Sequence, residues 1–465
     1  MKTTNRALPV RKNDRLELTI TALGAQGQGI GRHQGFVVFV PFALPGERVE
    51  VHIIKATASY AVGKLIAVLE ASPDRVMARC PVFGRCGGCQ LQHLTYEAQL
   101  EHKRRQVEDA LRTIGGVTIP VPPTVGMDEP WEYRNKAIFP VGQGQDGVEL
   151  GMYAPHSHTI VPTGRCPIQA AESEGFLSAI RQWARDEGVP AYDEETGRGV
   201  LRHVMLRSFA TTGQSMAVVV TAGHALPAQD ALVVALRAAV PSLVGVVQNI
   251  NPERTNVVLG QRERLLWGEP AVEAQLGRLR FQVLPQSFFQ VNTTQTERLY
   301  AIAGEFAALT GGELVVDAYC GVGAIGQSMA HRAGRVIGIE SVPQAVEEAR
   351  RSAARNGIAN AEYHCGRAED VFASLAADGL RPDVIVMDPP RRGCDEAFLQ
   401  AVAATQAPRL VYVSCNPATL ARDVKILRGL GYALTAVQPV DLFPQTEHVE
   451  CVCLLQDSKL ESTMR

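Results

Sequence analysis

ELVVDAYCGVGAIG, residues 313–326, joins a short β-branched run to a glycine-rich turn and decides how the C-terminal part of the chain folds. Further strand-like runs follow at RVIGIE (335–340), DVIVMD (383–388) and RLVYVSC (409–415), with helix-forming stretches such as VPQAVEEARRSAARNG (342–357) among them. Strands that alternate with helices of about 10 to 15 residues predict βαβ units and a parallel sheet. Ligands of such a sheet bind at the carboxyl ends of its strands. We therefore expect an α/β domain at residues 279–459, and we expect it to hold the chemistry.

The glycine-rich turn predicts a site for a nucleoside. Its three glycines stand between a strand and a helix, where they let a ligand lie against the backbone. Glu340 ends the next strand, 23 residues after Asp317, and a carboxylate there can accept both hydroxyls of a ribose. This pattern suits a dinucleotide as well as S-adenosylmethionine.

Asp388, Pro389 and Pro390 close the strand-like run DVIVMD and help to choose between these cofactors. They place an acidic group and a stiff turn where a substrate base would meet the cofactor, because proline fixes its backbone angle. A turn capped by an aspartate is the structural alternative. Together with the glycine-rich turn, this motif favours a methyltransferase over a dehydrogenase.

Cys415 ends the strand-like run RLVYVSC, and Asn416 and Pro417 follow it in a rigid turn. Catalytic groups gather at this edge of a parallel sheet. A helix that starts near Thr419 would lower the pKa of the thiol. A buried structural cysteine is the more common alternative, but the position at a strand end favours a nucleophile.

A covalent cysteine suits methylation of carbon 5 of uracil, because that carbon is a poor nucleophile by itself. A thiolate that adds to carbon 6 makes carbon 5 reactive toward a sulfonium methyl group, and a base then removes the proton from carbon 5. A carboxylate in FPQTEHVECVCLL (443–455) is a candidate for this base. Periodicity leaves both Glu447 and Glu450 open.

Cys80, Cys86 and Cys89 stand close together in ARCPVFGRCGGCQLQH (78–93), and Cys166 in GRCPIQ offers a fourth thiol. The ten cysteines of the chain are expected to stay reduced, because its N-terminus resembles no signal peptide. Three clustered thiols with a distant fourth suit tetrahedral zinc or an iron–sulfur cluster, and four unligated thiols are the alternative. The spacing alone does not decide between zinc and iron.

The whole chain has 465 residues, of which 46% are hydrophobic and 20% are charged. This length and composition predict a globular protein of several domains. Because no apolar stretch of about 18 residues occurs, we expect a cytoplasmic protein without a membrane span. We also expect a monomer without an obligate protein partner. Residues 13–66 show short β-branched runs separated by turns, and this pattern predicts a small five-stranded barrel. Although the net charge is −2, residues 1–65 carry nine Lys/Arg and four Asp/Glu, and a basic barrel suits RNA binding.

These motifs together resemble the RNA uracil-C5 methyltransferase family along nearly the whole chain. The matching stretches are CPVFGRCGGCQLQH (80–93), WEYRNKAIFP (131–140), GRCPIQ (164–169), LRHVMLRSFA (201–210), PQSFFQVN (285–292), DAYCGVGAIG (317–326), MDPPRRG (387–393), VYVSCNPATLARD (411–423) and DLFPQTEHVE (441–450). One departure is Ala324, where some members carry asparagine, and it leaves one cofactor contact in doubt.

The resemblance implies an α/β protein of three domains. These are a TRAM barrel of oligonucleotide-binding type at residues 8–67, a central α/β iron–sulfur domain at 72–278, and a Rossmann-like methyltransferase domain at 279–459. The central domain would carry a 4Fe-4S cluster on Cys80, Cys86, Cys89 and Cys166. A helix at residues 95–114 would pack on the catalytic domain.

The resemblance also implies roles for single residues. Cys415 matches the nucleophile and Glu450 the base that abstracts the proton, which chooses between the two glutamates. The family's S-adenosylmethionine contacts match Gln290, Tyr319, Glu340 and Asp388. Phe288 or Phe289 would stack near the flipped base.

A TRAM barrel combined with the cluster cysteines is similar to the members that act on 23S ribosomal RNA. We therefore expect 5-methyluridine in rRNA as the product. A uridine of the tRNA T-loop is one alternative substrate, and an iron–sulfur protein that binds RNA without catalysis is another possibility. A cytosine or DNA methyltransferase would carry its cysteine in a Pro-Cys motif nearer to the glycine-rich turn, whereas Cys415 comes late in its domain.

Overall fold

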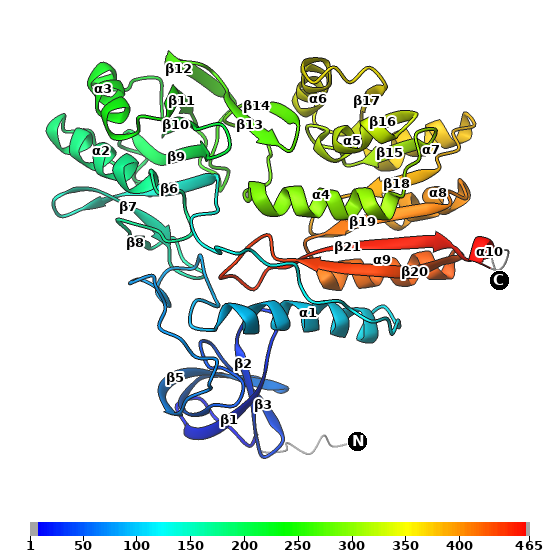
Figure 1. Cartoon of the computed structure of the whole chain (residues 1–465). Helices are drawn as coiled ribbons and strands as arrows, with labels where there is room; N and C mark the ends of the chain where they lie inside the picture. The colour runs from blue at the N-terminus through cyan, green and yellow to red at the C-terminus, as the bar shows by residue number, and fades with distance from the viewer. Residues whose placement is uncertain (1–7, 462–465) are drawn as a thin grey trace.

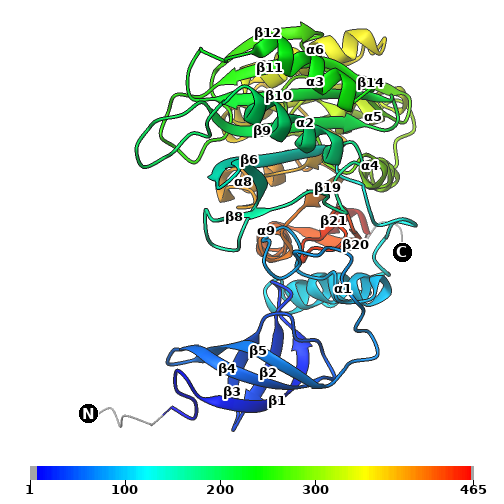
Figure 2. The same ribbon diagram turned by 90° about the vertical axis from the view of Figure 1, so that its left-hand side faces the viewer.

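The computed structural model describes residues 8–461, which form an N-terminal barrel, a central sheet and a C-terminal sheet (Figure 1). The barrel lies at one end of the molecule, and helix α1 (Tyr96–Thr113) lies between it and the C-terminal sheet in both views (Figure 2). Between residues 8 and 461, no helix combines the length and the apolar character needed to cross a membrane.

Five strands close into the N-terminal barrel in the order β1-β2-β3-β5-β4. They are β1 (Arg15–Leu23), β2 (Gly29–His33), β3 (Phe36–Val40), β4 (Arg48–Ala56) and β5 (Tyr60–Glu70). Side chains alternate between the two faces of a strand, so Leu18 and Ile20 are buried while Glu17 is exposed. The predicted five-stranded barrel is confirmed. Lys2 and Arg6, which add to its predicted basic character, lie outside the described residues.

The central part is a mixed seven-stranded sheet in the order β12-β11-β10-β9-β6-β7-β8. Its strands are β6 (Lys136–Gly144), β7 (Gly147–Tyr153), β8 (Ile160–Pro162), β9 (Leu201–Phe209), β10 (Gln214–Thr221), β11 (Leu243–Ile250) and β12 (Arg262–Gly268). Helices α2 (Ser173–Asp186) and α3 (Gln229–Ala239) bury apolar residues such as Phe176 and Leu236 in a shared core with this sheet. A hairpin of β13 (Val272–Leu276) and β14 (Leu279–Val283) leads into the C-terminal part.

The C-terminal sheet has seven strands in the order β17-β16-β15-β18-β19-β21-β20. They are β15 (Leu314–Ala318), β16 (Arg335–Glu340), β17 (Ala361–Cys365), β18 (Val384–Met387), β19 (Arg409–Ser414), β20 (Tyr432–Val440) and β21 (Glu450–Asp457). Strands β15 to β19 pair in parallel as predicted, whereas β21 runs antiparallel to both β19 and β20. The strand order reverses between β15 and β18, and open α/β sheets bind their ligands at such a point.

Helices cover both faces of the C-terminal sheet. They are α4 (Thr293–Ala307), α5 (Ala324–Met329) with a 3-10 turn η1 (Ala330–Arg332), α6 (Pro343–Arg355), α7 (Ala368–Ala377), α8 (Glu396–Ala404), α9 (Pro417–Gly429) and α10 (Ser458–Glu461). Val315 of β15 shares one core with Leu299 of α4, and the next residue, Val316, shares the opposite core with Phe398 of α8. Neighbouring residues of each strand thus contribute to both cores.

Helix α1 packs against α9 and β20 of the C-terminal sheet, where Val107 joins the apolar core. The side chain of Lys103 is fully buried, and its Nζ lies 2.5 Å from Oδ1 of Asp441, which is also fully buried. The same ammonium donates a hydrogen bond of 3.0 Å to the carbonyl of Phe443, and the hydroxyl of Tyr96 donates one of 2.9 Å to Asp441. A charged pair thus fixes α1 to the segment that follows β20.

We predict that Lys103→Met lowers the free energy of unfolding by about 3 to 5 kcal/mol, because it leaves the carboxylate of Asp441 buried without its cation. Arg335 forms an exposed ion pair of 2.6 Å with Glu362, so Arg335→Met serves as the control with a much smaller loss. Chemical denaturation at neutral pH measures both. Equal losses in the two variants would contradict this account.

Candidate active site

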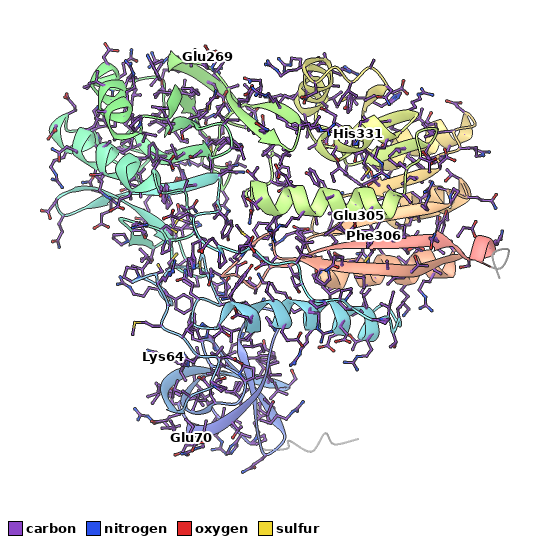
Figure 3. The ribbon with its side chains drawn as sticks, viewed as in Figure 1. Lys64, Glu70, Glu269, Glu305, Phe306 and His331 are labelled. Carbon is purple, nitrogen blue, oxygen red and sulfur yellow. The ribbon has the colours of Figure 1, made fainter. Side chains whose placement is uncertain are left out.

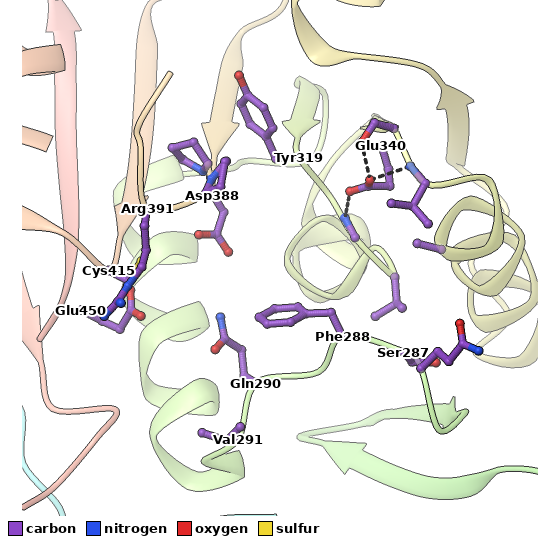
Figure 4. A pocket seen from close by; sticks show the side chains of 18 of the residues that line it. Ser287, Phe288, Gln290, Val291, Tyr319, Glu340, Asp388, Arg391, Cys415 and Glu450 are labelled. Atoms are coloured by element: carbon purple, nitrogen blue, oxygen red, sulfur yellow. Dashed lines mark hydrogen bonds between the residues drawn. The ribbon is translucent and has the colours of Figure 1, made fainter. Parts of the chain in front are cut away.

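A cavity of about 1180 Å³ opens at the carboxyl ends of the parallel strands. Its lining brings together all six residues that the sequence proposed for catalysis and cofactor binding. They are Gln290, Tyr319, Glu340, Asp388, Cys415 and Glu450. Figure 4 shows them around one space, with Glu340 on one side and Cys415, Glu450 and Arg391 on the other.

Glu340 is held at the end of β16 by three hydrogen bonds. The backbone N–H of Gly321 donates to Oε2 at 3.1 Å, and the N–H of Val342 donates to Oε1 at 2.8 Å (Figure 4). The hydroxyl of Ser341 donates to Oε1 at 3.1 Å. Gly321 has a φ of +55°, which is the left-handed conformation that glycine adopts without strain. The glycine-rich turn therefore fixes this carboxylate at the wall of the cavity.

The start of helix α5 packs closely on the end of β15. The N–H of Gly326 donates to Oδ2 of Asp317 at 2.8 Å, and a Cβ atom at residue 326 would also lie 2.8 Å from that oxygen. Burial raises the pKa of Asp317 to about 7. Tyr319 follows with a φ of +64° and donates its hydroxyl to Glu369 at 3.1 Å. Asp317 is thus buried beneath the turn, whereas Tyr319 reaches the cavity.

Cys415 is the first of the two residues between β19 and helix α9, and its side chain is half-buried. The side chain of Asn416 caps α9 by accepting a hydrogen bond of 3.1 Å from the N–H of Ala418. Asn416 Nδ2 and Thr419 Oγ1 both donate to the carbonyl of Arg391, at 3.1 and 3.2 Å. These bonds tie the turn after Cys415 to the turn after Asp388.

Glu450 is the first residue of β21, and it is 4% exposed. Ser414 pairs with Cys451 across the antiparallel β19–β21 ladder. Continued by one residue, this register would bring Cys415 opposite Glu450, and the carboxylate of Glu450 is close enough to raise the pKa of Cys415. Glu447 lies three residues earlier and lines a neighbouring groove, not this cavity.

The charges and the burial in the cavity show that one prediction from the sequence, a lowered pKa for Cys415, is wrong. Burial, followed by the nearby carboxylates of Glu450 and Asp388, raises the pKa of Cys415 to about 11, although the start of α9 was expected to lower it. Burial also raises the pKa of Asp388 to about 7 and that of Glu450 well above its usual value. The positive charge of Arg391 acts against this shift and lowers the pKa of Cys415.

Arg391 and His448 line the cavity but were not singled out from the sequence. Nη2 of Arg391 lies 2.9 Å from Nδ1 of His448. Both residues belong to motifs that the sequence did mark, MDPPRRG and DLFPQTEHVE. Their contact joins positions 57 residues apart, and no local pattern reveals such a contact.

Phe288 and Phe289 have different surroundings. Phe289 is buried in the core, with its ring centroid 5.6 Å from that of Phe209 and 5.7 Å from that of Phe281. Phe288 is 71% exposed, and Figure 4 shows its ring in the cavity beside Gln290. Of the two rings proposed for stacking, the one at 288 faces the open site.

A second groove, of about 980 Å³, reaches Cys415 from the side of the barrel. Its walls include the β1–β2 connection around Gln26, the face of α1 around His102, and the turn around Asn416. Arg391, Cys415 and His448 line both spaces. The thiol therefore stands where two separate openings meet.

The four cysteines proposed as metal ligands line one further small cavity. Its walls contain Cys80, Cys86, Cys89 and Cys166. Burial, with the three neighbouring thiols contributing, raises the pKa of Cys89 to about 12. Gly88 lines both this cavity and the large one. Within residues 8–461, no group of three Cys, His, Asp or Glu side chains has the arrangement expected for holding a metal ion.

Two protein-family models match the chain, one in the C-terminal part and one in the N-terminal barrel. A model described as tRNA (Uracil-5-)-methyltransferase matches residues 269–458, which include the large cavity's catalytic candidates. A TRAM domain model matches residues 9–66, which cover the closed barrel except for the last four residues of β5.

Individual relatives extend the likeness over nearly the whole chain. An RNA methyltransferase of Halalkalibacterium halodurans is 47% identical over 449 residues, covering 96% of this chain and 98% of the relative. One of Clostridium acetobutylicum is 42% identical over 454 residues, covering 97% and 99%. The crystal structure of Pyrococcus abyssi tRNA (uracil-54, C5)-methyltransferase with S-adenosyl-L-homocysteine has a TM-score of 0.77 at 28% identity, covering 95% of this chain and 100% of that one. The chain therefore belongs to the RNA uracil-5-methyltransferase family that carries a TRAM domain.

Proposed function

We propose that this protein methylates carbon 5 of a uridine in RNA, with Cys415 as the nucleophile and Glu450 as the base. The observation that carries this proposal is that the thiol just after β19 and the buried carboxyl at the start of the neighbouring strand β21 line one cavity. The methyl donor of the family is S-adenosylmethionine, and its ribose hydroxyls would be accepted by Glu340. Gln290, Tyr319 and Asp388 would complete the donor site.

The proposed reaction makes and breaks one bond to the thiol. Sγ of Cys415 adds to carbon 6 of the uracil, and the electron pair released at carbon 5 takes the methyl group from the sulfonium. Glu450 then removes the proton from carbon 5. The electron pair of the broken C–H bond restores the double bond between carbons 5 and 6, and Sγ leaves as the thiolate. A raised pKa suits Glu450, because its carboxylate then holds a proton more tightly than an ordinary glutamate does.

Two openings at Cys415 support separate approaches for the two substrates. The donor would occupy the large cavity beside Glu340, and the RNA would reach the thiol through the groove along the barrel and α1. A uridine in structured RNA must leave its stack to enter a pocket, and the exposed ring of Phe288 offers a surface for stacking. The TRAM barrel would contact the flanking nucleotides.

We propose 23S ribosomal RNA as the substrate, because the chain combines the barrel with the four-cysteine cavity. A tRNA uridine is the second candidate. It is favoured by the similarity to the Pyrococcus abyssi enzyme, whose name gives tRNA uracil-54 as its target.

We further propose that Cys80, Cys86, Cys89 and Cys166 hold a 4Fe-4S cluster. All four cysteines line one small cavity, whose walls also include apolar side chains such as Phe83, Met152 and Ile168. Such surroundings fit thiolate ligands of an iron–sulfur cluster, whose properties depend on burial and hydrogen bonds around the sulfurs. The cluster would supply a fixed attachment point for two separate segments of the chain.

The first test uses RNA that contains 5-fluorouridine, because fluorine cannot leave as a cation and the covalent adduct is trapped. With S-adenosylmethionine and a 23S rRNA fragment, we expect a slowly migrating protein–RNA band on a denaturing gel. Cys415→Ala should give no band, whereas Cys365→Ala, at an exposed cysteine outside the cavity, should behave as the wild type. Glu450→Gln should accumulate an adduct even with ordinary uridine, since the last step then lacks its base.

An absent band with the wild-type protein on both the rRNA fragment and tRNA would overturn the covalent mechanism. Preferential trapping of tRNA over the rRNA fragment would overturn only the proposed substrate.

The second test measures the thiol. Because the pKa of Cys415 is about 11, alkylation of this residue by iodoacetamide should rise with pH up to pH 9.5 without a plateau. Arg391→Leu should slow the reaction at each pH, about tenfold for each unit by which the pKa rises. Arg392→Leu removes a neighbouring arginine and is the control. Peptide mass spectrometry follows residue 415, and equal rates in the two variants would contradict the role of Arg391.

The third test concerns the cysteines. Protein purified without oxygen should be brown, absorb broadly toward the blue and contain about four iron atoms per chain. Cys89→Ser should lose most of the iron. A colourless protein with one zinc ion per chain would contradict the cluster.

A further inference from the structure

The segment 441–449 joins β20 to Glu450, the first residue of β21. Its middle residue, Gln445, is 2% exposed and has a φ of +71°. Residues other than glycine keep such a backbone conformation only where the surrounding structure holds them in it. The residues that contact Gln445 therefore hold the backbone of this segment in the path that leads to Glu450.

The first neighbours come from the cysteine segment. The backbone N–H groups of Gln90 and Leu91, the two residues that follow Cys89, both donate to the carbonyl of Gln445, at 3.1 and 3.0 Å. Two donors on one buried carbonyl fix its direction. The orientation of the Gln445 peptide thus depends directly on how the chain leaves Cys89.

Gln99 of helix α1 makes a second set of contacts. Its Nε2 donates to Oε1 of Gln445 at 3.1 Å and to the carbonyls of Leu91 and Leu94 at 3.1 and 2.9 Å. Its Oε1 accepts from the N–H of Gln445 at 3.0 Å. One buried side chain therefore holds the cysteine segment and Gln445 together.

The segment around Cys166 reaches the same place. The hydroxyl of Tyr133 donates to the carbonyl of Pro444 at 2.9 Å. The next residue, Arg134, donates its N–H to the carbonyl of Ile168 at 3.0 Å, two residues after Cys166. The Cys89 segment is thus hydrogen-bonded directly to Gln445, and the Cys166 segment is linked to Pro444 through the two residues Tyr133 and Arg134.

We propose that Gln445 is a positioning residue through which the four-cysteine site holds Glu450 opposite Cys415. This inference rests on the proposed function and assigns a task to the cysteine site within it. The Lys103–Asp441 pair fixes the beginning of segment 441–449, and β21 fixes its end. Gln445 fixes the middle, so its release would let Glu450 shift without unfolding the sheet.

A pair of substitutions at one position tests this. Gln445→Gly and Gln445→Val both remove the side chain, but only valine opposes a positive φ. We expect Gln445→Val to lower kcat on the order of ten- to a hundredfold with little change in the KM for S-adenosylmethionine. Gln445→Gly should lose several times less, because the backbone carbonyl keeps its direction. Equal losses in the two variants would overturn the proposal.

A second pair removes one buried glutamine from each of two sites. Gln99→Leu deletes the contacts to Gln445, and Gln248→Leu deletes a comparable set in the central sheet, to Thr221, Gly223 and His224. We expect only Gln99→Leu to lower kcat and to speed amide hydrogen exchange in peptides covering 441–450, about tenfold. Unchanged exchange in Gln99→Leu, with both variants folded by thermal denaturation, would contradict the proposal.

The cysteine side has a readout that does not depend on activity. Cys89→Ser should raise amide exchange in residues 441–450 as Gln99→Leu does, while residues 335–355 of β16 and α6 keep their protection. No change in residues 441–450 would overturn the coupling. The proposed function is tested separately by adduct trapping. If that function is wrong, the wild-type protein traps no 5-fluorouridine adduct, whatever the amide exchange shows.

Discussion

The pairing of β19 with β21 is the constraint on which the proposed chemistry depends. Parallel strands present only their carboxyl ends at the ligand-binding edge of the sheet, so the edge at β19 offers Cys415. An antiparallel neighbour presents its first residue at the same edge, and that residue is Glu450. A slip of one residue would turn the carboxyl to the opposite face of the sheet. One antiparallel strand in a parallel sheet thus brings together two groups that are distant in sequence.

This arrangement places three acidic groups in a space where burial disfavours charge. The pKa values of Cys415, Asp388 and Glu450 are all raised, and each carboxylate raises the pKa of the thiol further. Arg391 is the cation that lowers the pKa of Cys415. Its carbonyl is held by the cap of α9 and its guanidinium lies against His448, so the position of this charge is set by both turns. A fixed cation can favour a thiolate at the moment when a substrate displaces water.

The sequence predicts the parts of this structure that depend on local patterns. The barrel and the parallel sheet follow from strand patterns. Glu340, Asp388 and Cys415 are found because each stands at the end of a strand or just past it. The raised pKa of Cys415 could not be predicted, because it depends on burial and on Glu450 across the sheet. Neither could the Lys103–Asp441 pair, whose members are 338 residues apart. What the sequence leaves out are long-range polar contacts, which have no periodicity.

Those polar contacts determine which of several packings α1 adopts. An apolar helix face can slide or rotate on an apolar sheet with small losses, because hydrophobic contact has no preferred direction. Lys103 and Gln99 allow no such freedom, since a buried charge or amide displaced from its partners loses several hydrogen bonds in a medium of low dielectric. Their partners, Asp441 and Gln445, lie in the segment that ends at Glu450. The helix that stands between barrel and sheet therefore sets the geometry of the site through directional contacts.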